Sequence, residues 1–366
     1  MKIAFDYQVF SSQKYGGISR YFFELSQVMG DLSGVDLKII SPFYVNEYLK
    51  YKPMSTVGIH VPQLAKTGRI YRAVNKFISS GVMRRYSPDI VHETYYSYAG
   101  VAPKHSKVVV TVQDMIHEIL PQNFSSRDKT RGEKAASINR ADHIICASEN
   151  TYNDLVEILR VPGDKVSVVH HGFELMFSPS GLRRHKDPYI LFVGNRGGYK
   201  NFDCLLQAYA ITPFLYKNFH LVVFGGGVLT PYEKARINQL SSEGLHIYQQ
   251  NGDDSVLADL YKFAEVLVYP SLYEGFGIPP LEAMSCGCPV ICSNISSIPE
   301  VVGDAAVLFE PESVESLVAA LLELLDNTPF RNELLVKGYE QCKKFSWRKS
   351  AMETLNVYHN ILGSKF

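Results

Sequence analysis

Two glutamates frame a glycine-rich segment in the C-terminal half of the sequence. Glu274 and Glu282 belong to the stretch Tyr-Glu-Gly-Phe-Gly-Ile-Pro-Pro-Leu-Glu, which follows an apolar, strand-like run at residues 266–269. Pro280 suits the first turn of a helix, whose positive end would then lie beside the same loop. Alternative interpretations are a solvated acid for Glu274 and a carboxylate that only stabilises the helix dipole for Glu282. The combined pattern favours a ligand site.

A second glycine-rich loop, residues 192–202, carries two cations. Arg196 and Lys200 follow the apolar run 189–193, and Asn201 stands where the next helical pattern begins. A guanidinium fork and a compact ammonium group both suit a diphosphate, although isolated cations are more often solvated. Two carboxylates alone would also fit the acid and nucleophile of a glycoside hydrolase. That interpretation gives the cationic loop no role.

Gly16 and Gly17 stand between the first strand-like run and a helical pattern. Glycines let the backbone approach a ligand, and a helix amino terminus offers N–H groups to an anion. The alternative is a plain tight turn. The segment does not follow the Gly-x-Gly-x-x-Gly dinucleotide fingerprint, so an NAD site is disfavoured.

Composition limits the class of protein. The 366 residues include 37 Lys plus Arg and 37 Asp plus Glu, so no overall charge favours nucleic acid as a partner. Cys286, Cys288 and Cys292 lack the spacing and the fourth ligand of a zinc site, and we expect buried hydrophobic cysteines and no metal. The first residues run directly into a strand-like segment, and no apolar run is long enough to span a membrane. These features predict a cytoplasmic enzyme.

Short β-branched runs alternate with helical patterns along the whole chain, which indicates parallel sheets covered by helices. The series restarts after a polar, proline-containing stretch. We expect two Rossmann-like domains, at residues 1–175 and 189–345, with a linker at 176–188 and a final helix at 346–366 that packs back on the first domain. Expected strands are residues 2–5, 36–40, 90–92, 108–112, 143–147, 166–170, 189–193, 220–224, 245–248, 266–269, 289–292 and 306–309. Ligand-binding loops should follow the carboxyl ends of these strands.

With these loops in view, the chain resembles the family 4 glycosyltransferases of the GT-B fold over nearly its whole length. The segment from Glu274 to Glu282 matches the two-glutamate motif of that family. Further matches are Gly16-Gly17, residues 193–201 and residues 298–301. The resemblance implies an α/β protein in which two Rossmann-like domains face a deep cleft.

The resemblance also implies a reaction and roles for residues. It implies that a hexose, with mannose favoured, is transferred with retention from a nucleoside diphosphate sugar, and that no cofactor or metal is used. GDP-hexose is favoured over a UDP-sugar as the donor. Glu274 would hold the donor sugar, Glu282 the ribose, and Arg196 and Lys200 the diphosphate. The remaining donor-binding residues would be Gly16, Gly17, Gly194, Asn201, Gly275, Phe276, Gly277 and Ile278.

The expected acceptor is a glycan or a lipid-linked glycan in polysaccharide or lipopolysaccharide biosynthesis. Many relatives have His-Asp where this chain has Gln113-Asp114. We expect Asp114 to act in catalysis, Gln113 to replace the histidine as a hydrogen-bonding group, and His117 to be too far along the chain for direct replacement. Ser148 matches a family position, but its sequence context favours a helix N-cap.

The sequence is also compatible with two other functions and with a membrane surface as a further partner. The rivals are a sugar-nucleotide epimerase on the same fold and a non-catalytic sugar-nucleotide-binding subunit. Residues 69–85 combine a helical apolar pattern with several Lys and Arg residues. Such a helix either lies peripherally on the inner face of the cytoplasmic membrane or packs its apolar face on the core with a solvated basic side.

Overall fold

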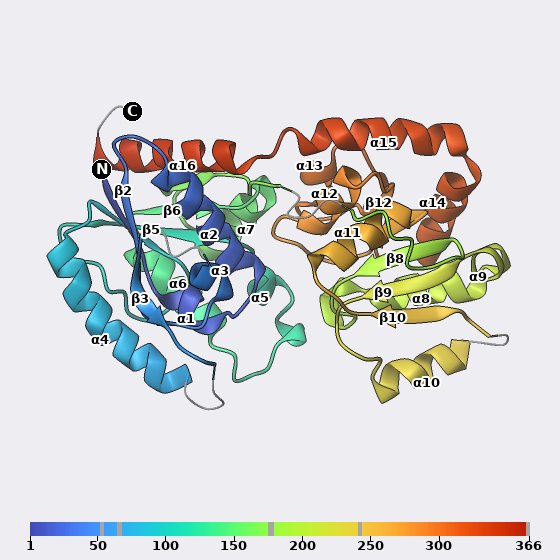
Figure 1. Cartoon of the computed structure of the whole chain (residues 1–366), viewed down its shortest axis with the longest axis horizontal. Coiled ribbons are helices and arrows are strands. Elements are labelled where there is room, and N and C mark those ends of the chain that lie inside the picture. Colours follow the sequence, from blue (N-terminus) through green and yellow to red (C-terminus); the bar gives the residue numbers. More distant parts are fainter. Residues whose placement is uncertain (52–54, 64–67, 175–178, 241–243, 364–366) are drawn as a thin grey trace. The chain divides into compact units, whose positions relative to one another are not determined.

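The computed structural model describes residues 1–51, 55–63, 68–174, 179–240 and 244–363. The chain divides into two compact units (Figure 1). Unit 1 comprises Met1–Gly172 and Phe345–Phe366, and unit 2 comprises Phe173–Lys344. The predicted boundary between residues 175 and 176 lies outside the described residues.

Unit 1 is built on one parallel sheet with the strand order β3-β2-β1-β4-β5-β6-β7. The strands are β1 (Lys2–Phe5), β2 (Asp36–Tyr44), β3 (Thr56–His60), β4 (Ile90–Glu93), β5 (Lys107–Val112), β6 (His143–Cys146) and β7 (Val166–Val168). The sequence predicted all of these except β3. That strand lies at the sheet edge and is half exposed, so it lacks the apolar run that marks a buried strand.

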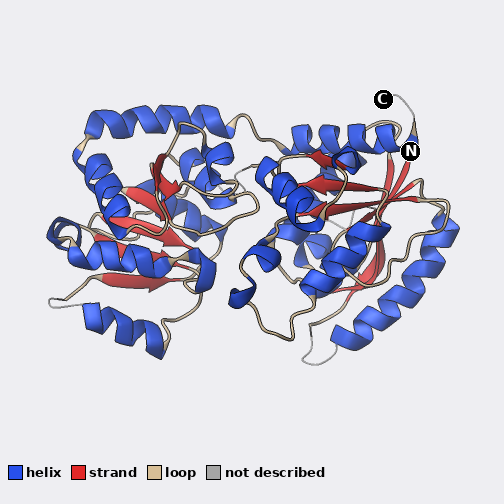
Figure 2. Ribbon diagram, turned by 180° about the vertical axis from the view of Figure 1, so that it is seen from behind, coloured by secondary structure: helices blue, strands red, loops and turns tan. Residues whose placement is uncertain are grey.

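Helices cover the sheet of unit 1 (Figure 2). They are α1 (Gln8–Ser12), α2 (Gly17–Gly30), α3 (Glu47–Tyr51), α4 (Gly68–Tyr86), α5 (Ile116–Ile119), α6 (Thr130–Arg140), α7 (Glu149–Leu159) and α16 (Trp347–Leu362). The C-terminal helix α16 packs against α2 (Figure 1). Both helices bury apolar side chains in one core cluster, in which Phe22 and Leu25 of α2 join Leu355 and Tyr358 of α16.

A buried histidine joins α16 to the sheet. The ring nitrogens of His92 on β4 lie 2.6 Å from the Tyr358 hydroxyl and 2.8 Å from the Thr111 hydroxyl. Burial lowers the pKa of His92 to about 3, so the ring is neutral in the folded protein. The C-terminal segment therefore contributes a polar partner to the centre of unit 1.

Unit 2 has a second parallel sheet with the order β10-β9-β8-β11-β12-β13. Its strands are β8 (Tyr189–Val193), β9 (His220–Phe224), β10 (Ile247–Gln250), β11 (Val266–Tyr269), β12 (Val290–Ser293) and β13 (Val307–Phe309). The sequence predicted these six strands to within two residues at each end. The central strands β8 and β11 are buried over their whole length, which explains why their apolar runs were easy to recognise.

The helices of unit 2 enclose this sheet (Figure 2). They are α8 (Phe202–Ile211), α9 (Pro213–Asn218), α10 (Pro231–Leu240), α11 (Asp254–Phe263), α12 (Ile278–Ser285), α13 (Ile298–Val302), α14 (Val314–Asp326) and α15 (Thr328–Cys342). The core joins Phe202 and Leu205 of α8 to Leu321 of α14, under strand residues such as Val268. Each sheet therefore has its own core and positions the loops that follow its own strands.

Because His92 is neutral in the folded protein, we expect the stability of unit 1 to fall in acid. Its folded pKa of about 3 lies below the value near 6.5 of an unfolded chain, so its stabilising contribution is complete above pH 6.5 and is lost as the pH falls towards 3. Between pH 7.5 and pH 5.0 this linkage costs the native state about 2 kcal/mol. The fluorescence of Trp347, the only tryptophan, reports unfolding of unit 1. We expect its thermal midpoint to fall on acidification, and to fall less in His92→Gln. An equal fall in both proteins would contradict this account.

Candidate functional site

The centre of the candidate site in unit 2 is an ion pair between Lys200 and Glu274. The Lys200 Nζ lies 2.6 Å from a carboxylate oxygen of Glu274 and 3.3 Å from the hydroxyl of Tyr269. Lys200 follows β8 and Glu274 follows β11, and these two strands are neighbours in the sheet. Both side chains are largely but not fully buried, at 16% and 13% exposure. The structure therefore brings together two residues that the sequence placed on separate loops.

Two serines fix the backbone on either side of this glutamate. The Glu274 N–H donates to the hydroxyl of Ser296 at 3.0 Å. The hydroxyl of Ser297 donates to the carbonyl oxygens of Glu274 and Phe276, both at 2.9 Å. Because the loop backbone is held from β12 as well as β11, the carboxylate of Glu274 has a defined position without a ligand.

Glycine starts the helix that carries the second glutamate. Gly277 precedes α12 with a φ of 109°, in the left-handed region that a side chain would strain. Glu282 lies further along α12 and accepts a hydrogen bond of 3.0 Å from the hydroxyl of Tyr261 on α11. Glu282 is therefore held by a side-chain partner and does not act only on the helix dipole. Gly275 and Phe276 lie in the loop after Glu274, and Ile278 is the first residue of α12.

The environment of Arg196 differs from that of a cation whose N–H groups are free to bind a diphosphate. Its side chain is 2% exposed, and its guanidinium donates to Glu233 at 2.6 Å and to the carbonyl oxygen of Gly225 at 2.8 Å. Further donation at 3.2 Å reaches the carbonyl oxygens of Gly226 and Val228. Arg196 therefore holds the loop after β9 through these hydrogen bonds. The sequence predicted that Arg196 and Lys200 bind a diphosphate, but most donors of Arg196 already have partners within the protein.

Sequence reasoning missed Glu233, which is the partner of Arg196. Burial alone would raise the pKa of Glu233, but the hydrogen bonds from Arg196 and Thr230, together with the positive charge of Arg196, outweigh burial and lower this pKa. Thr230 and Glu233 also form reciprocal contacts, from Thr230 N–H to the carboxylate at 2.6 Å and from Glu233 N–H to the hydroxyl at 3.2 Å. The pattern Thr-x-x-Glu before a helix is a capping-box signal that could have located it.

Two residues shape the backbone of the cationic loop. Gly194 has a φ of 130° and its N–H donates to the carbonyl oxygen of Phe224 at 2.9 Å. Asn201 has a φ of 54° immediately before α8, and its side-chain amide donates to the carbonyl oxygen of Pro311 at 2.8 Å. Left-handed conformations of this kind favour Gly and Asn, which accounts for both residue types at the end of β8.

In unit 1 the predicted glycine loop opens α2. Gly16 immediately precedes the helix and Gly17 is its first residue. A Cβ added at Gly16 would lie 2.4 Å from the side-chain oxygen of Gln13, whereas nothing lies within 4 Å of one at Gly17. A side chain at Gly16 would therefore displace the end of the Gln13 side chain, whereas the space around Gly17 at the helix amino terminus is open.

Gln113, predicted on the acceptor side, is buried and paired with a histidine. Its side-chain oxygen lies 2.6 Å from Nε2 of His171, and its N–H donates to the Tyr96 hydroxyl at 3.3 Å. Burial lowers the pKa of His171 to about 3, so its neutral ring donates the proton on Nε2 to Gln113. His171, which stacks on Tyr21 at 4.7 Å, was missed by sequence reasoning.

A fully buried lysine holds the loop of Asp114. The Nζ of Lys134 on α6 donates to the carbonyl oxygen of Asp114 at 2.8 Å and to the carboxylate of Glu118 at 2.7 Å. The Asp114 carboxylate itself is one-third exposed. Lys134 was also missed, because a lysine in a helical pattern is usually solvated and gives no sequence signal of burial.

The two other residues predicted for the acceptor side have structural partners. His117 stacks on Phe124 with ring centroids 3.9 Å apart, and its Nε2 lies 3.8 Å from Asp128. Ser148 is buried and accepts a hydrogen bond of 3.1 Å from the N–H of Thr151, so its interpretation as the N-cap of α7 is confirmed.

Within the described ranges, no group of three or more His, Cys, Asp or Glu side chains could hold a metal ion. Cys286, Cys288 and Cys292 are free and buried, as expected. Burial raises the pKa of the Cys286 thiol to about 11. Among the described residues, no helix has both the length and the apolar character needed to cross a membrane.

Comparisons with known proteins identify the family of this chain. Residues 15–177 match the model "Glycosyltransferase Family 4", and residues 177–341 match "Glycosyl transferases group 1". O-antigen chain mannosyltransferase B of Escherichia coli is 30% identical over 305 residues, which cover 79% of this chain and 78% of the relative. The chain belongs to glycosyltransferase family 4. It is therefore a hexosyltransferase, as the sequence predicted.

Two further similarities concern a second curated relative and the fold. O-antigen chain mannosyltransferase RfbU of Salmonella typhimurium is 24% identical, over 83% of this chain and 86% of the relative. The structure of sucrose-phosphate synthase from Thermosynechococcus elongatus superposes with a TM-score of 0.76 at 20% identity and covers 99% of each chain. This last similarity concerns the fold, and it confirms the predicted GT-B architecture of this family 4 protein.

The buried partnership of Arg196 with Glu233 predicts a local loss of stability in Glu233→Ala. Removing the carboxylate leaves a buried guanidinium without its charged partner, at a cost of about 1–3 kcal/mol. We expect roughly tenfold or faster hydrogen exchange in peptides covering residues 225–233, measured by mass spectrometry. Glu333→Ala is the control, because its partner Lys337 is much more exposed and such pairs contribute little. Unchanged exchange at residues 225–233 would refute the anchoring role.

Proposed function

We propose that the chain transfers a hexose, with mannose favoured, from a nucleoside diphosphate sugar to a glycan or lipid-linked glycan, with retention at the anomeric carbon. The observation that carries this proposal is the Lys200–Glu274 pair at the ends of β8 and β11. The mannosyltransferases among its relatives support mannose, and GDP-mannose as the donor. The acceptor would then be a growing surface polysaccharide.

Donor binding is assigned to unit 2. Glu274 would bind hydroxyls of the donor sugar. Lys200, which pairs with Glu274 in this structure, would also interact with the diphosphate. Glu282, already oriented by Tyr261, would accept from the ribose hydroxyls. Arg196 would contribute its positive charge and hold the loop after β9, since its donors are engaged by Glu233 and backbone carbonyls.

The proposed step requires no nucleophile from the protein. The acceptor hydroxyl would attack the anomeric carbon on the face from which the diphosphate leaves, and a diphosphate oxygen would take the hydroxyl proton. The bond between the anomeric carbon and the diphosphate oxygen breaks as the new glycosidic bond forms. Lys200, Arg196 and the amino terminus of α12 would stabilise the developing negative charge, which is electrostatic catalysis by groups already in place.

Acceptor binding is assigned to unit 1. Asp114 would lie closest to the acceptor hydroxyl, since Lys134 fixes its backbone while a third of its side chain stays exposed. Gln113, held by His171, would replace the histidine of other family members as a neutral hydrogen-bonding group. Gly16 and Gly17 would provide the open amino terminus of α2 for a phosphate oxygen.

Lys200→Ala tests the proposed donor site. Loss of the cation should lower kcat/KM for transfer from GDP-mannose by about 10²–10³-fold, because stabilisation of the leaving group is lost. Glu274→Gln should also reduce transfer, through the sugar hydroxyls. Lys217→Ala, which removes an exposed lysine of α9, is the matched control and should retain full activity.

Circular dichroism should show that these variants are folded. Normal turnover by folded Lys200→Ala would refute the donor assignment. Conversion of GDP-mannose to another nucleotide sugar without an acceptor would instead indicate an epimerase. Nucleotide binding by the wild type, detected by thermal shift, with no turnover of any donor would indicate a non-catalytic subunit.

The exposed side chains of helix α4 support the proposal that unit 1 makes peripheral contact with a membrane. Ile70 and Phe77, two turns apart on one face, are 63% and 83% exposed, so they do not pack on the core. Exposed cations on the same helix are Arg72, Lys76, Arg84 and Arg85, whereas the side chain of Arg69 lies outside the described residues. Exposed apolar groups beside cations complement an anionic lipid surface. We therefore propose that α4 lies on the inner face of the cytoplasmic membrane.

Vesicles of phosphatidylglycerol and phosphatidylcholine test this contact. The wild type should co-sediment with them at low salt, and the double variant Phe77→Ser, Lys76→Ser should bind several-fold more weakly, since each lysine near the surface contributes about 1 kcal/mol. Tyr232→Ser is the control, because Tyr232 is a comparably exposed aromatic residue in unit 2. Failure of the wild type to bind these vesicles would refute the membrane assignment.

A further inference from the structure

A small cavity in unit 1 lies beyond the carboxyl ends of β1 and β4. Its volume is about 100 Å³. Pockets that enclose a whole drug-sized ligand have roughly 300–1,000 Å³, so this cavity suits a single sugar unit better than a nucleotide. Its lining includes Tyr7, Gln8, Arg72, Tyr95, Tyr96 and Glu133. The sequence predicted none of these as site residues.

The lining has the chemistry of a carbohydrate site. Three tyrosines supply apolar ring surface with hydroxyl groups at its edge, and the rings of Tyr95 and Tyr96 lie 4.9 Å apart. Arg72 of α4 and Glu133 of α6 add one cation and one anion. Among the residues that the structure describes, neither side chain has a hydrogen bond or an ion pair.

These two charges select for a neutral ligand. A sugar hydroxyl both donates and accepts hydrogen bonds, so it can pair with the donor-only guanidinium of Arg72 and with the acceptor-only carboxylate of Glu133. A phosphate group would be attracted by Arg72 but repelled by Glu133. The cavity therefore differs from the cationic loop of unit 2 and fits an uncharged saccharide.

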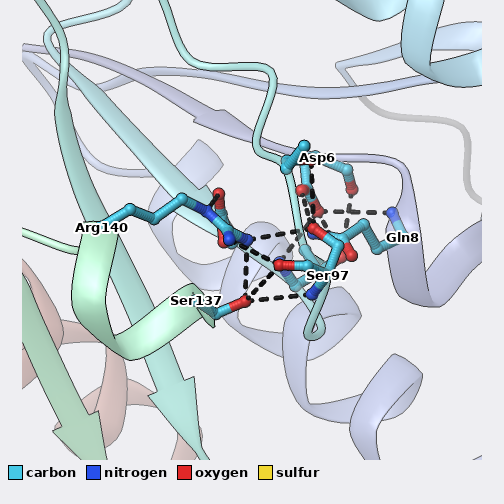
Figure 3. A network of polar contacts seen from close by, with 8 residues as sticks. Asp6, Gln8, Ser97, Ser137 and Arg140 are labelled. Atoms are coloured by element: carbon cyan, nitrogen blue, oxygen red, sulfur yellow. Dashed lines mark hydrogen bonds and ion pairs between the residues drawn. The ribbon is translucent and has the colours of Figure 1, made fainter. Parts of the chain in front are cut away.

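A buried carboxylate fixes the floor of this cavity. Asp6, 1% exposed, accepts hydrogen bonds of 2.9 and 2.7 Å from the N–H and hydroxyl of Thr94. Its second oxygen accepts from the side-chain amide of Gln8 at 2.7 Å. Figure 3 shows Gln8 directed towards Asp6. The cavity residue Gln8 is thereby tied to the ends of both β1 and β4.

A second buried carboxylate, that of Glu93, holds the part of the wall that includes Ser97. Arg140 of α6 donates to Glu93 at 2.8 Å, to the Ser137 hydroxyl at 2.7 Å and to the Ser97 hydroxyl at 3.0 Å. The N–H of Ser97 in turn donates to Ser137 at 3.0 Å (Figure 3). These bonds join α6, which carries Glu133, to the loop after β4. The walls are therefore rigid before any ligand binds, which lowers the cost of binding.

The cavity also shares a wall with the proposed acceptor residues. The hydroxyl of Tyr96 accepts from the N–H of Gln113 at 3.3 Å. The Nζ of Lys134 lies 5.5 Å from the centre of the Tyr96 ring and donates to the carbonyl oxygen of Asp114. A ligand against Tyr96 would thus be one side chain away from the backbone of Gln113 and Asp114.

We propose that this cavity is a subsite for one neutral sugar unit of the acceptor glycan, with Arg72 and Glu133 as its specificity-determining residues. The inference rests on the proposed glycosyltransfer and names the part of the acceptor that unit 1 recognises. The two charged residues, which come from α4 and α6, select the pattern of hydroxyl groups on that sugar.

Two measurements on the intact chain test the subsite. The first is saturation-transfer difference NMR without a donor, using oligosaccharides of mannose, glucose, galactose and N-acetylglucosamine. The second is steady-state transfer from GDP-mannose, which gives KM for the acceptor and for the donor separately. The variants are Arg72→Ala and Glu133→Ala, both on the cavity surface. Arg131→Ala is the control, since this exposed residue of α6 does not line the cavity.

The expected result is an NMR signal for at least one saccharide that is lost in both variants and kept in the control. The acceptor KM should rise at least tenfold in both variants, while the donor KM stays within twofold. Binding of no saccharide by the wild type, or signals and acceptor KM values unchanged in both variants, would overturn the subsite. If the wild type transferred no sugar from any nucleotide donor, the proposed function would fail, whereas saccharide binding lost in both variants would still establish the subsite.

Discussion

The carboxyl ends of β8 and β11 meet at one edge of the unit 2 sheet, and the candidate donor site depends on this adjacency. Lys200 and Glu274 are 74 positions apart in the sequence, yet their charged groups lie 2.6 Å apart because their strands are hydrogen-bonded neighbours. A parallel sheet directs all its carboxyl ends to one side, so residues that follow successive strands converge there. The serines at the end of β12 then fix the loop of Glu274 from a third strand.

Ion pairs that involve buried groups hold other loops within each unit. Lys134, Arg140 and Arg196 all have a carboxylate partner, and each also donates to a backbone carbonyl oxygen of a loop. A charge removed from water requires such partners, because desolvation is costly when it is not compensated. Each pair therefore fixes a loop in one conformation. Loops at the ends of parallel strands thus acquire defined shapes without regular secondary structure.

The two units differ in the chemistry that their strand ends present. In unit 2 two cations and a helix amino terminus suit the negative charge of a leaving diphosphate. In unit 1 the cavity beside Tyr96 combines aromatic rings with one cation and one anion, which suits neutral hydroxyl groups. This division matches a reaction in which one substrate carries phosphate and the other is a glycan. On the proposed function, the residues after the strands of each sheet would therefore recognise a different substrate.

The sequence by itself determined the two parallel sheets, the loops that follow their strands and the family of the protein. Buried strands such as β8 produce apolar runs, and the motif from Glu274 to Glu282 is a local pattern, so both are visible in the linear chain. The edge strand β3 was not visible, because half-exposed residues carry no such signal. Tertiary structure alone decided that Arg196 is occupied by Glu233, that Gln113 pairs with His171 and that Lys134 is buried beneath Asp114. Those contacts join residues that are distant in sequence. Neither periodicity nor spacing indicates which charged side chain will be desolvated in the fold and will therefore need a partner.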